Sequence, residues 1–367
     1  MTDENRIDLI RPDAPSLALH GPLAVGVRTV TLEVPAALEG TRALTVELWY
    51  PAAVGTPLGT CYDTILRDGS TPVQYTGSAR RDAPAAIGVS APLVILSHGY
   101  PGNRYLMAHL AESLAAKGYV VAAPDHAGST YDDQQAFGVT LLNRPTDQRG
   151  LIDAVAMLED DVGALVATSH VGVIGYSMGG YGALVLGGAG LSAAAITHER
   201  APQDGSLACH LAGSETHRAL RDPRIRAIVP IGPWGRAAGF WDASGLAGLS
   251  VPMLLMAGTA DEVSGYGAMR RIFAESSGTE RHLLSFAHAG HNAAAPIPAP
   301  PESYADPVWD TVRMNNIAQH FTAAFLALHL RGDEDMRVYL EPDRWEGFDP
   351  QTARGLQLER LGLGDTV

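Results

Sequence analysis

The sequence predicts an α/β fold with a mostly parallel sheet, and two observations carry that prediction. Apolar, β-branched runs alternate with helix-forming segments from about residue 93 to residue 330, which is typical of a sheet covered by helices. A strand at Ala91 to Ser97, a helix at Tyr105 to Lys117 and a strand at Tyr119 to Ala123 imply a right-handed parallel crossover. We therefore expect a single domain over residues 1–367.

The composition bounds the class of protein. The chain has 367 residues, of which 46% are hydrophobic and 18% charged, as in a globular protein with a large core. Its formal net charge of −14 and its lack of a Lys/Arg-rich run argue against a nucleic-acid or membrane-surface partner. Because no segment approaches a membrane span and the first residues contain no apolar leader core, we expect a cytoplasmic protein. Cys61 and Cys209 fit neither a metal site nor a disulfide framework, so we expect reduced thiols.

The other elements follow from periodicity and from start and stop signals. An antiparallel pair is predicted at Val25 to Val34 and Ala43 to Tyr50, where apolar and polar residues alternate. Pro145 and Asp147 in a first turn predict a helix that starts at Arg144 and runs to about Asp161. Later strands are predicted at Val171 to Ile174, Ile225 to Ile231, Pro252 to Ala257 and His282 to Phe286, and later helices at Met178 to Leu186 and Val312 to Leu330.

Three segments interrupt this pattern. From about Ala52 to Ser90 the chain has no sustained period and many Gly, Pro, Asp and Thr residues, so we expect a long insertion. Long loops in compact domains are often functional, and this one is expected to wall a pocket. The stretch from about Gly188 to Arg221 is a candidate cap over the site, and residues 333–367 are expected to form an accessory tail.

The most informative motif is GYSMG at residues 175–179, between a buried strand and the start of a small-residue helix. The glycines two before and two after Ser177 allow a sharp turn without a Cβ clash, and such a turn lifts the hydroxyl clear of the sheet edge. The pattern alone is weak, because a chain with 40 glycines can contain it by chance. Its context predicts a nucleophile elbow, and a tight turn with a capping serine is the alternative.

An activated serine needs a base, and the base needs an orienting carboxylate. The strand that ends at Ala257 leads to Asp261, and the strand that ends at Phe286 leads to His291. Both loops leave the same edge of a parallel sheet as Ser177. We therefore assign Ser177 as nucleophile, Asp261 as orienter and His291 as base.

Two neighbours compete for these roles. Glu262 adjoins Asp261, but the rotation of one residue directs its side chain elsewhere. His288 follows its strand too closely to reach across the site, whereas Gly290 gives the backbone freedom just before His291. We expect His288 at the surface or behind the reacting residues.

A tetrahedral intermediate also needs donors for its oxyanion, and two backbone N–H groups usually supply them. Met178 follows the nucleophile, and Tyr100 lies in the flexible loop after the strand that ends at Ser97, so their N–H groups are the candidates. His98 is expected to hold this loop by hydrogen bonding. Asp125 and His126 precede the serine in the chain and are expected to organise their own loop rather than to react.

Five motifs together resemble the dienelactone hydrolase-like branch of the α/β hydrolases, near platelet-activating-factor acetylhydrolases and bacterial cutinase-like polyester hydrolases. They are SHGYPGNR (residues 97–104), AAPDHAGST (122–130), GYSMGG (175–180), AGTADEV (257–263) and HAGHN (288–292). The resemblance covers about residues 91–330 and implies the α/β-hydrolase fold. It also implies Tyr100 as the second oxyanion donor.

The chain departs from these relatives in three ways. Dienelactone hydrolases proper use a cysteine nucleophile where this chain has Ser177, which favours esters other than lactones. In the acetylhydrolases the acid follows an earlier strand, and Ile231 to Trp234 here contains no carboxylate, which favours Asp261. Trp234 resembles the aromatic residue that flanks the acyl site of cutinase-like enzymes, with a core tryptophan as the alternative. Tyr176 is a second candidate pocket residue.

These observations predict a serine carboxylic-ester hydrolase that forms an acyl-enzyme, acts on a small-molecule ester and needs no cofactor or metal. Three alternatives stay open. The first is an acyltransferase, or an amide or lactone hydrolase, with the same triad. The second is a polyester hydrolase, against which the two insertions argue. The third is a non-catalytic binding protein, because a fold does not fix a function.

Overall fold

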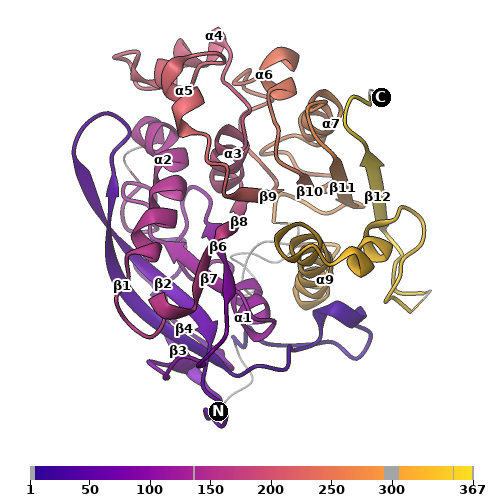
Figure 1. Cartoon of the computed structure of the whole chain (residues 1–367). Helices are drawn as coiled ribbons and strands as arrows, with labels where there is room; N and C mark the ends of the chain where they lie inside the picture. Colours follow the sequence, from indigo (N-terminus) through magenta and orange to yellow (C-terminus); the bar gives the residue numbers. More distant parts are fainter. Residues whose placement is uncertain (1–4, 135–136, 293–305, 350, 366–367) are drawn as a thin grey trace.

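The computed structural model describes residues 5–134, 137–292, 306–349 and 351–365, and its centre is a ten-stranded sheet (Figure 1). In spatial order the strands are β12 (Leu356–Leu361), β11 (Arg281–Phe286), β10 (Met253–Gly258), β9 (Ile225–Ile231), β8 (Val166–Tyr176), β6 (Ala91–Ser97), β7 (Val120–Pro124), β2 (Thr41–Pro51), β1 (Val25–Pro35) and β5 (Arg80–Arg81). The strands from β11 through β7 run parallel, and β2 and β12 join them antiparallel. The mostly parallel sheet and its opening antiparallel pair are thus confirmed.

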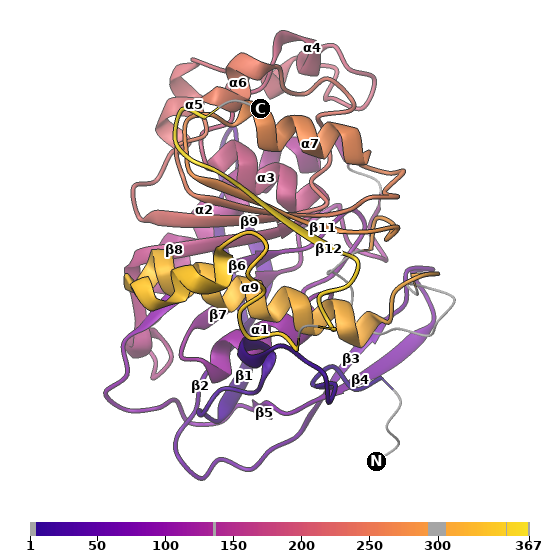
Figure 2. The same ribbon diagram turned by 90° about the vertical axis from the view of Figure 1, so that its right-hand side faces the viewer.

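Helices cover both faces of this sheet (Figure 2). One face packs against α1 (Ala108–Ala116) and α9 (Thr311–Arg331), and the other against α2 (Phe137–Ala156), α3 (Met178–Leu186), α6 (Ala243–Ala247) and α7 (Tyr266–Glu275). The shorter elements are α4 (Ala193–Ile196), α5 (Glu215–Leu220), and the 3-10 turns η1 (Ser16–Ala18), η2 (Gly163–Leu165), η3 (Ser206–His210) and η4 (Glu334–Leu340). None of the described helices is long and apolar enough to cross a membrane.

Two hydrophobic cores, one on each face, explain why the central strands are apolar throughout. In β8, Val171 and Val173 belong to the α2 and α3 core, whereas Ile174 and Tyr176 belong to the α1 and α9 core. Side chains of a strand alternate between faces, so a strand covered on both faces needs apolar residues at every position. These continuous runs are what made the central strands predictable.

The predicted start of α2 at Arg144 is wrong. The helix already includes Phe137, and Pro145 lies in its interior. Proline is common in a first helical turn, but it is also tolerated further along when tertiary contacts compensate for the missing hydrogen bond. Here Leu141 and Ile152 are buried on either side of the proline, so packing against the sheet continues the helix through it.

The expectation of a structureless insertion at residues 52–90 is also wrong. This segment contains a hairpin of β3 (Thr60–Ile65) and β4 (Pro72–Gly77), and β5 pairs with β1 at the sheet edge. The hairpin is held to α1 by the buried carboxylate of Glu112. That carboxylate accepts hydrogen bonds from the Tyr62 hydroxyl at 2.5 Å, Ser78 N–H at 2.9 Å and Ala79 N–H at 3.1 Å. The segment is therefore ordered by tertiary contacts, which its local sequence pattern does not reveal.

The expected accessory tail is part of the sheet. β12 pairs antiparallel with β11 along its whole length, so β11 is not an open edge. The segment is short and its apolar residues Leu356, Leu358 and Leu361 are interrupted by Gln357, Glu359 and Arg360, which conceals a strand with one buried face. An unpaired β11 edge would expose backbone groups that favour aggregation, and β12 covers them.

We expect Leu358→Ala to lower the free energy of unfolding by about 2–5 kcal/mol, because it removes a buried leucine from the core on the α9 side. Leu363→Ala is the matched control. Leu363 is 74% exposed, so its substitution should change the free energy by less than about 0.5 kcal/mol. Urea denaturation measures both, and equal effects would mean that β12 adds nothing to the core.

Candidate active site

Ser177 lies at a sharp turn between β8 and α3. Its backbone has φ 52° and ψ −109°, a conformation that a residue with a Cβ rarely adopts. Its N–H donates to the carbonyl oxygen of Ile231 at 2.8 Å, and its own carbonyl oxygen accepts from Tyr181 at 3.0 Å and Trp234 at 3.2 Å. Three hydrogen bonds, to β9, to α3 and to the loop after β9, therefore hold the turn in a strained conformation.

Close contacts require the two flanking glycines. A Cβ on Gly175 would lie 2.1 Å from the carbonyl oxygen of Gly179, and a Cβ on Gly179 would lie 2.1 Å from the carbonyl oxygen of Ser97. Real Cβ atoms do not approach oxygen so closely, so both positions exclude a side chain. The glycines predicted to close the turn also allow α3 to pack directly against the end of β6.

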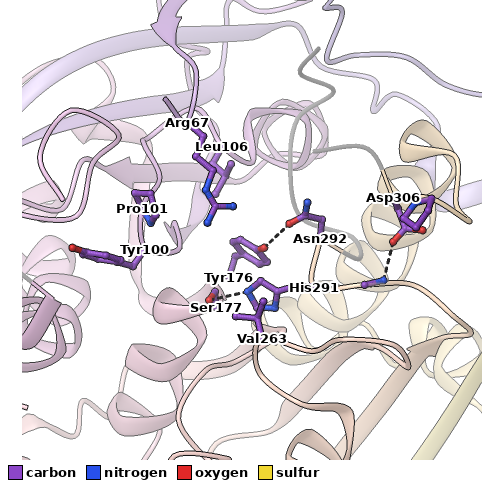
Figure 3. Close-up of a pocket in the computed structure, with 12 residues that line it drawn as sticks. Arg67, Tyr100, Pro101, Leu106, Tyr176, Ser177, Val263, His291, Asn292 and Asp306 are labelled. Carbon is purple, nitrogen blue, oxygen red and sulfur yellow. Dashed lines mark hydrogen bonds between the residues drawn. The ribbon is translucent and has the colours of Figure 1, made fainter. Parts of the chain in front are cut away.

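The structure brings Ser177, Asp261 and His291 together, although they come from three separate loops. The Nε2 atom of His291 lies 3.0 Å from the hydroxyl oxygen of Ser177, and its Nδ1 atom lies 2.8 Å from Oδ2 of Asp261 (Figure 3 shows Ser177 and His291). Because a carboxylate only accepts hydrogen bonds, Nδ1 carries the proton. This tautomer leaves Nε2 free to accept the hydroxyl proton of Ser177.

Asp261 is held in an orientation that favours its ionised form. Its Oδ1 atom accepts from the N–H groups of Val263 and Ser264, both at 2.8 Å. Burial alone raises the pKa of Asp261, but the hydrogen bond and charge of His291 and these two N–H groups outweigh it, so the pKa lies below its ordinary value. The ionised carboxylate therefore stabilises the folded chain at neutral pH, and this contribution is lost as the pH falls from the ordinary toward the lowered pKa.

The competing residues lie outside this hydrogen-bonded set. Glu262 and His288 are both exposed. The backbone N–H of His288 donates to the Thr259 hydroxyl at 2.7 Å, and its φ of 61° marks a turn that precedes Gly290. The surface position expected for His288 is thus what the structure has.

The loop after β6 packs against the nucleophile turn. A Cβ on Gly99 would lie 3.3 Å from the Ser177 Cβ, and Tyr100 lines the same cavity as Ser177. Met178 is the first residue of α3, so its N–H has no partner inside the helix. No carbonyl in the described part of the chain accepts from the N–H of Tyr100 or Met178. Both candidate oxyanion donors therefore lie beside Ser177 and are available to a ligand oxygen.

A cavity of about 280 Å³ opens over Ser177 and His291 (Figure 3). Its lining combines apolar and aromatic side chains with polar and charged ones in nearly equal numbers. They are Arg67, Tyr100, Pro101, Leu106, Tyr176, Ser177, Val263, Gly290, His291, Asn292, Asp306 and Pro307. The volume suits a small molecule.

The two candidate pocket residues have different positions. Tyr176 lines the cavity, its hydroxyl donates to Oδ1 of Asn292 at 2.9 Å, and its ring centroid lies 5.1 Å from that of His291. Trp234 is not among the lining residues. It packs against Phe137 and Phe240, with ring centroids 5.3 Å and 4.9 Å away. Trp234 is thus a partly buried residue at the edge of the core on the α3 side, and it does not line the cavity.

The two insertions also differ. Residues 52–90 contribute Arg67, whose guanidinium points into the cavity in Figure 3, in agreement with the expected pocket wall. Residues 188–221 contribute no lining residue. They contact the aromatic residues beside the site instead, since the His198 ring centroid lies 5.1 Å from that of Phe240 and the Arg200 guanidinium lies 5.1 Å from the Phe137 ring centroid. The expected cap thus packs beside the cavity rather than over it.

Two residues of the cavity wall, Arg67 and Asp306, were not predicted from the sequence. Arg67 lies at the tip of the hairpin, where no motif or period marks it. The Asp306 carboxylate accepts from the N–H of Gly290 at 2.8 Å and from Val308 and Trp309 at 2.9 Å, so it holds the residue next to His291. An aspartate three residues before a tryptophan is a weak turn signal, and the local sequence around Asp306 does not indicate that it lies at the site.

The other titratable candidates serve the interior. His98 and His126 are buried, and burial together with the positive charge of Arg144 lowers the pKa of each well below its ordinary value, so both are neutral. Asp125 pairs with Arg104. Within the described residues, no group of three or more His, Cys, Asp or Glu side chains could hold a metal ion. Cys61 and Cys209 are free thiols.

Comparison with known proteins supports this architecture. A family model described as alpha/beta hydrolase fold matches residues 92–188, from β6 to just beyond α3. No curated protein sequence matches the chain. The chain has the α/β-hydrolase fold, and the match supports a place in the α/β-hydrolase superfamily, whose members are generally hydrolytic.

We expect Gly179→Ala to destabilise the protein by at least about 1–3 kcal/mol, because its methyl group would overlap the carbonyl oxygen of Ser97. Gly267→Ala in α7 is the control, since a Cβ there meets nothing within 4 Å and alanine favours a helix. Thermal or urea unfolding compares the two variants. A Gly179→Ala protein as stable as Gly267→Ala would show that α3 does not pack as closely as described.

Proposed function

We propose that the protein is a serine hydrolase of carboxylic esters that works through an acyl-enzyme. The observation that carries this proposal is the chain of two hydrogen bonds from Ser177 through His291 to Asp261, at 3.0 Å and 2.8 Å, at the floor of a cavity. Nucleophile, base and orienter in this geometry define acyl-transfer chemistry on several unrelated folds.

The first half-reaction begins when the Ser177 oxygen attacks the ester carbonyl. Its proton moves to Nε2 of His291, and a carbon–oxygen bond forms to give a tetrahedral intermediate. Asp261 remains ionised, since its pKa lies below the ordinary value, and it stabilises the imidazolium that forms. The imidazolium then gives its proton to the departing alcohol oxygen, which leaves an ester of Ser177.

The oxyanion of each intermediate is proposed to bind to the backbone N–H groups of Met178 and Tyr100. The N-terminus of α3 adds the favourable end of its dipole at the same position. In the second half-reaction, water gives a proton to Nε2 of His291 and attacks the acyl carbon. The bond from that carbon to the Ser177 oxygen then breaks, His291 returns the proton to Ser177, and the acid is released. The charge created in the reaction is thus met by fixed dipoles and no step requires a metal or cofactor.

The same residues would support transfer to another acceptor, or amide or lactone cleavage, if water were excluded or the leaving group differed. Analysis of products with competing alcohols and amines separates these activities. A polyester hydrolase is less favoured, because the hairpin places Arg67 in the wall of a cavity of about 280 Å³, a size that suits a small molecule. Release of soluble monomers from a polymer film would support the polyester-hydrolase alternative.

We expect Ser177→Ala to lower kcat on a p-nitrophenyl ester by several powers of ten, by analogy with triad deletions of on the order of 10⁶. The wild-type protein should also react with a fluorophosphonate probe at Ser177, and the variant should not. Ser97→Ala is the comparison. Because Ser97 is buried and is not the residue expected to react, this variant should still be labelled at Ser177. A wild-type protein without labelling would favour a non-catalytic binding role, and normal turnover by Ser177→Ala would overturn the assignment.

Arg67 leads us to expect a preference for esters with a negative substituent. No carboxylate within the described residues pairs with it, whereas Asp306 and Asp261 are committed to other partners. Arg67→Gln should lower kcat/KM for p-nitrophenyl hemisuccinate by about two- to fivefold and leave p-nitrophenyl butyrate unchanged. Arg271→Gln, an exposed change of equal charge on α7, is the control. Equal loss on both esters would exclude charge recognition.

A further inference from the structure

A second Ser–His–Asp arrangement lies behind the oxyanion loop, in the interior of the protein. The Ser97 hydroxyl lies 2.9 Å from Nε2 of His126, and Nδ1 of His126 lies 2.8 Å from Oδ2 of Asp147. These distances repeat those of the proposed catalytic residues. All three residues are at most 1% exposed, so no substrate reaches this serine.

The hydrogen-bond network fixes every proton in this cluster. Asp147 only accepts, so Nδ1 of His126 carries a proton and Nε2 accepts from the Ser97 hydroxyl. The backbone N–H of His126 donates to Nε2 of His98 at 3.1 Å, so the proton of His98 is on Nδ1, which donates to the carbonyl oxygen of Gly99 at 2.7 Å. Both histidines are thus neutral, and the hydrogen bond from His126 to His98 continues to the carbonyl oxygen of Gly99.

Arg144 of α2 joins this cluster to the same loop. Its guanidinium donates to the carbonyl oxygen of His98 and, at 2.5 Å, to the hydroxyl of Ser129. Ser129 in turn donates to the carbonyl oxygen of Gly99 at 3.3 Å. The two carbonyl groups that precede Tyr100 are therefore both held from the interior.

Because a peptide group is planar, fixing the Gly99 carbonyl also fixes the direction of the Tyr100 N–H. The Gly99 carbonyl and the Tyr100 N–H belong to one trans peptide group, so they point in opposite directions. When His98 and Ser129 hold the Gly99 oxygen toward the interior, the Tyr100 N–H must face outward, where Tyr100 lines the cavity above Ser177.

Stability alone does not explain a guanidinium at this position. Arg144 is 1% exposed, and none of the described carboxylates makes a hydrogen bond with it, since Asp147 is taken by Arg42 and His126. A buried charge without a partner of opposite charge costs free energy, and apolar replacements of buried ionic groups are often neutral or stabilising. A fork of donors that reaches His98 and Ser129 at once is what arginine supplies and an apolar residue does not.

We propose that Arg144 and Ser129 are positioning residues of the hydrolase, which orient the Tyr100 N–H toward the oxyanion through the Gly99–Tyr100 peptide. This inference rests on the proposed function and extends it, because neither side chain touches the substrate. Loss of the anchor should weaken binding of the transition state far more than binding of the substrate.

The test compares Arg144→Met with Arg281→Met. Arg281 is also fully buried and donates to backbone carbonyls, among them those of Phe273 and Ala274, but it lies on β11 away from the cavity. For Arg144→Met we expect kcat on p-nitrophenyl butyrate to fall by about 10- to 100-fold with KM within threefold, since removal of a whole oxyanion donor costs about 10²–10³. Arg281→Met should keep kcat within twofold, with both values corrected for the folded fraction. Arg144→Lys should recover part of the loss.

Ser129→Ala removes a single oxygen atom and decides the question if Arg144→Met does not fold. We expect it to lower kcat by about three- to tenfold with unchanged KM, and to weaken inhibition by an alkyl boronic acid, whose tetrahedral adduct carries the oxyanion, by the same factor. Unchanged kcat in Ser129→Ala, or equal losses in Arg144→Met and Arg281→Met, would overturn this inference and leave the esterase proposal standing. A wild-type protein with neither ester turnover nor probe labelling would overturn both.

Discussion

The contact on which the rest of the site depends is the approach of α3 to the end of β6. Gly179 lies so close to the Ser97 carbonyl that a methyl group there has no room. This approach places the loop after β6 beside Ser177, and it forces the serine backbone into a strained conformation that three hydrogen bonds maintain. The strained residue is the proposed nucleophile, and the surrounding sheet, with its two apolar cores, supplies the rigidity that maintains its conformation.

The site is preorganised on every side of the serine. Asp306 holds Gly290, Asp261 holds the imidazole of His291, and the network of Arg144 and His126 holds the loop that carries Tyr100. In each case a side chain that is itself fixed by hydrogen bonds orients the next group. Such support is what allows fixed dipoles to stabilise a developing charge without rearrangement.

Elements and site residues could be predicted from the sequence where a single physical cause acts on residues close together in the chain. Continuous apolar runs predicted β6, β9 and β10, because burial on both faces requires them, and Ser177, Asp261 and His291 were predictable because parallel strands end at one edge. They could not be predicted where contacts between residues far apart in the chain determine the local structure. Pro145 resembled a helix start because the buried leucines around it are recognisable only against the sheet. Likewise, β12 depends on β11, and Arg67 depends on a hairpin that Glu112 ties to α1.

The attachment of the hairpin to Glu112 of α1 affects how the protein can change over evolutionary time. The hairpin is fixed at its base by Tyr62, Ser78 and Ala79 on Glu112, whereas its tip, which carries Arg67 into the cavity, is exposed. Substitutions at the tip alter what the cavity presents without disturbing the sheet, the strained turn or the network behind the loop. The chemical character of the cavity wall can therefore change between descendants of this chain at little cost in folding, while the residues that hold Ser177, Asp261 and His291 stay the same.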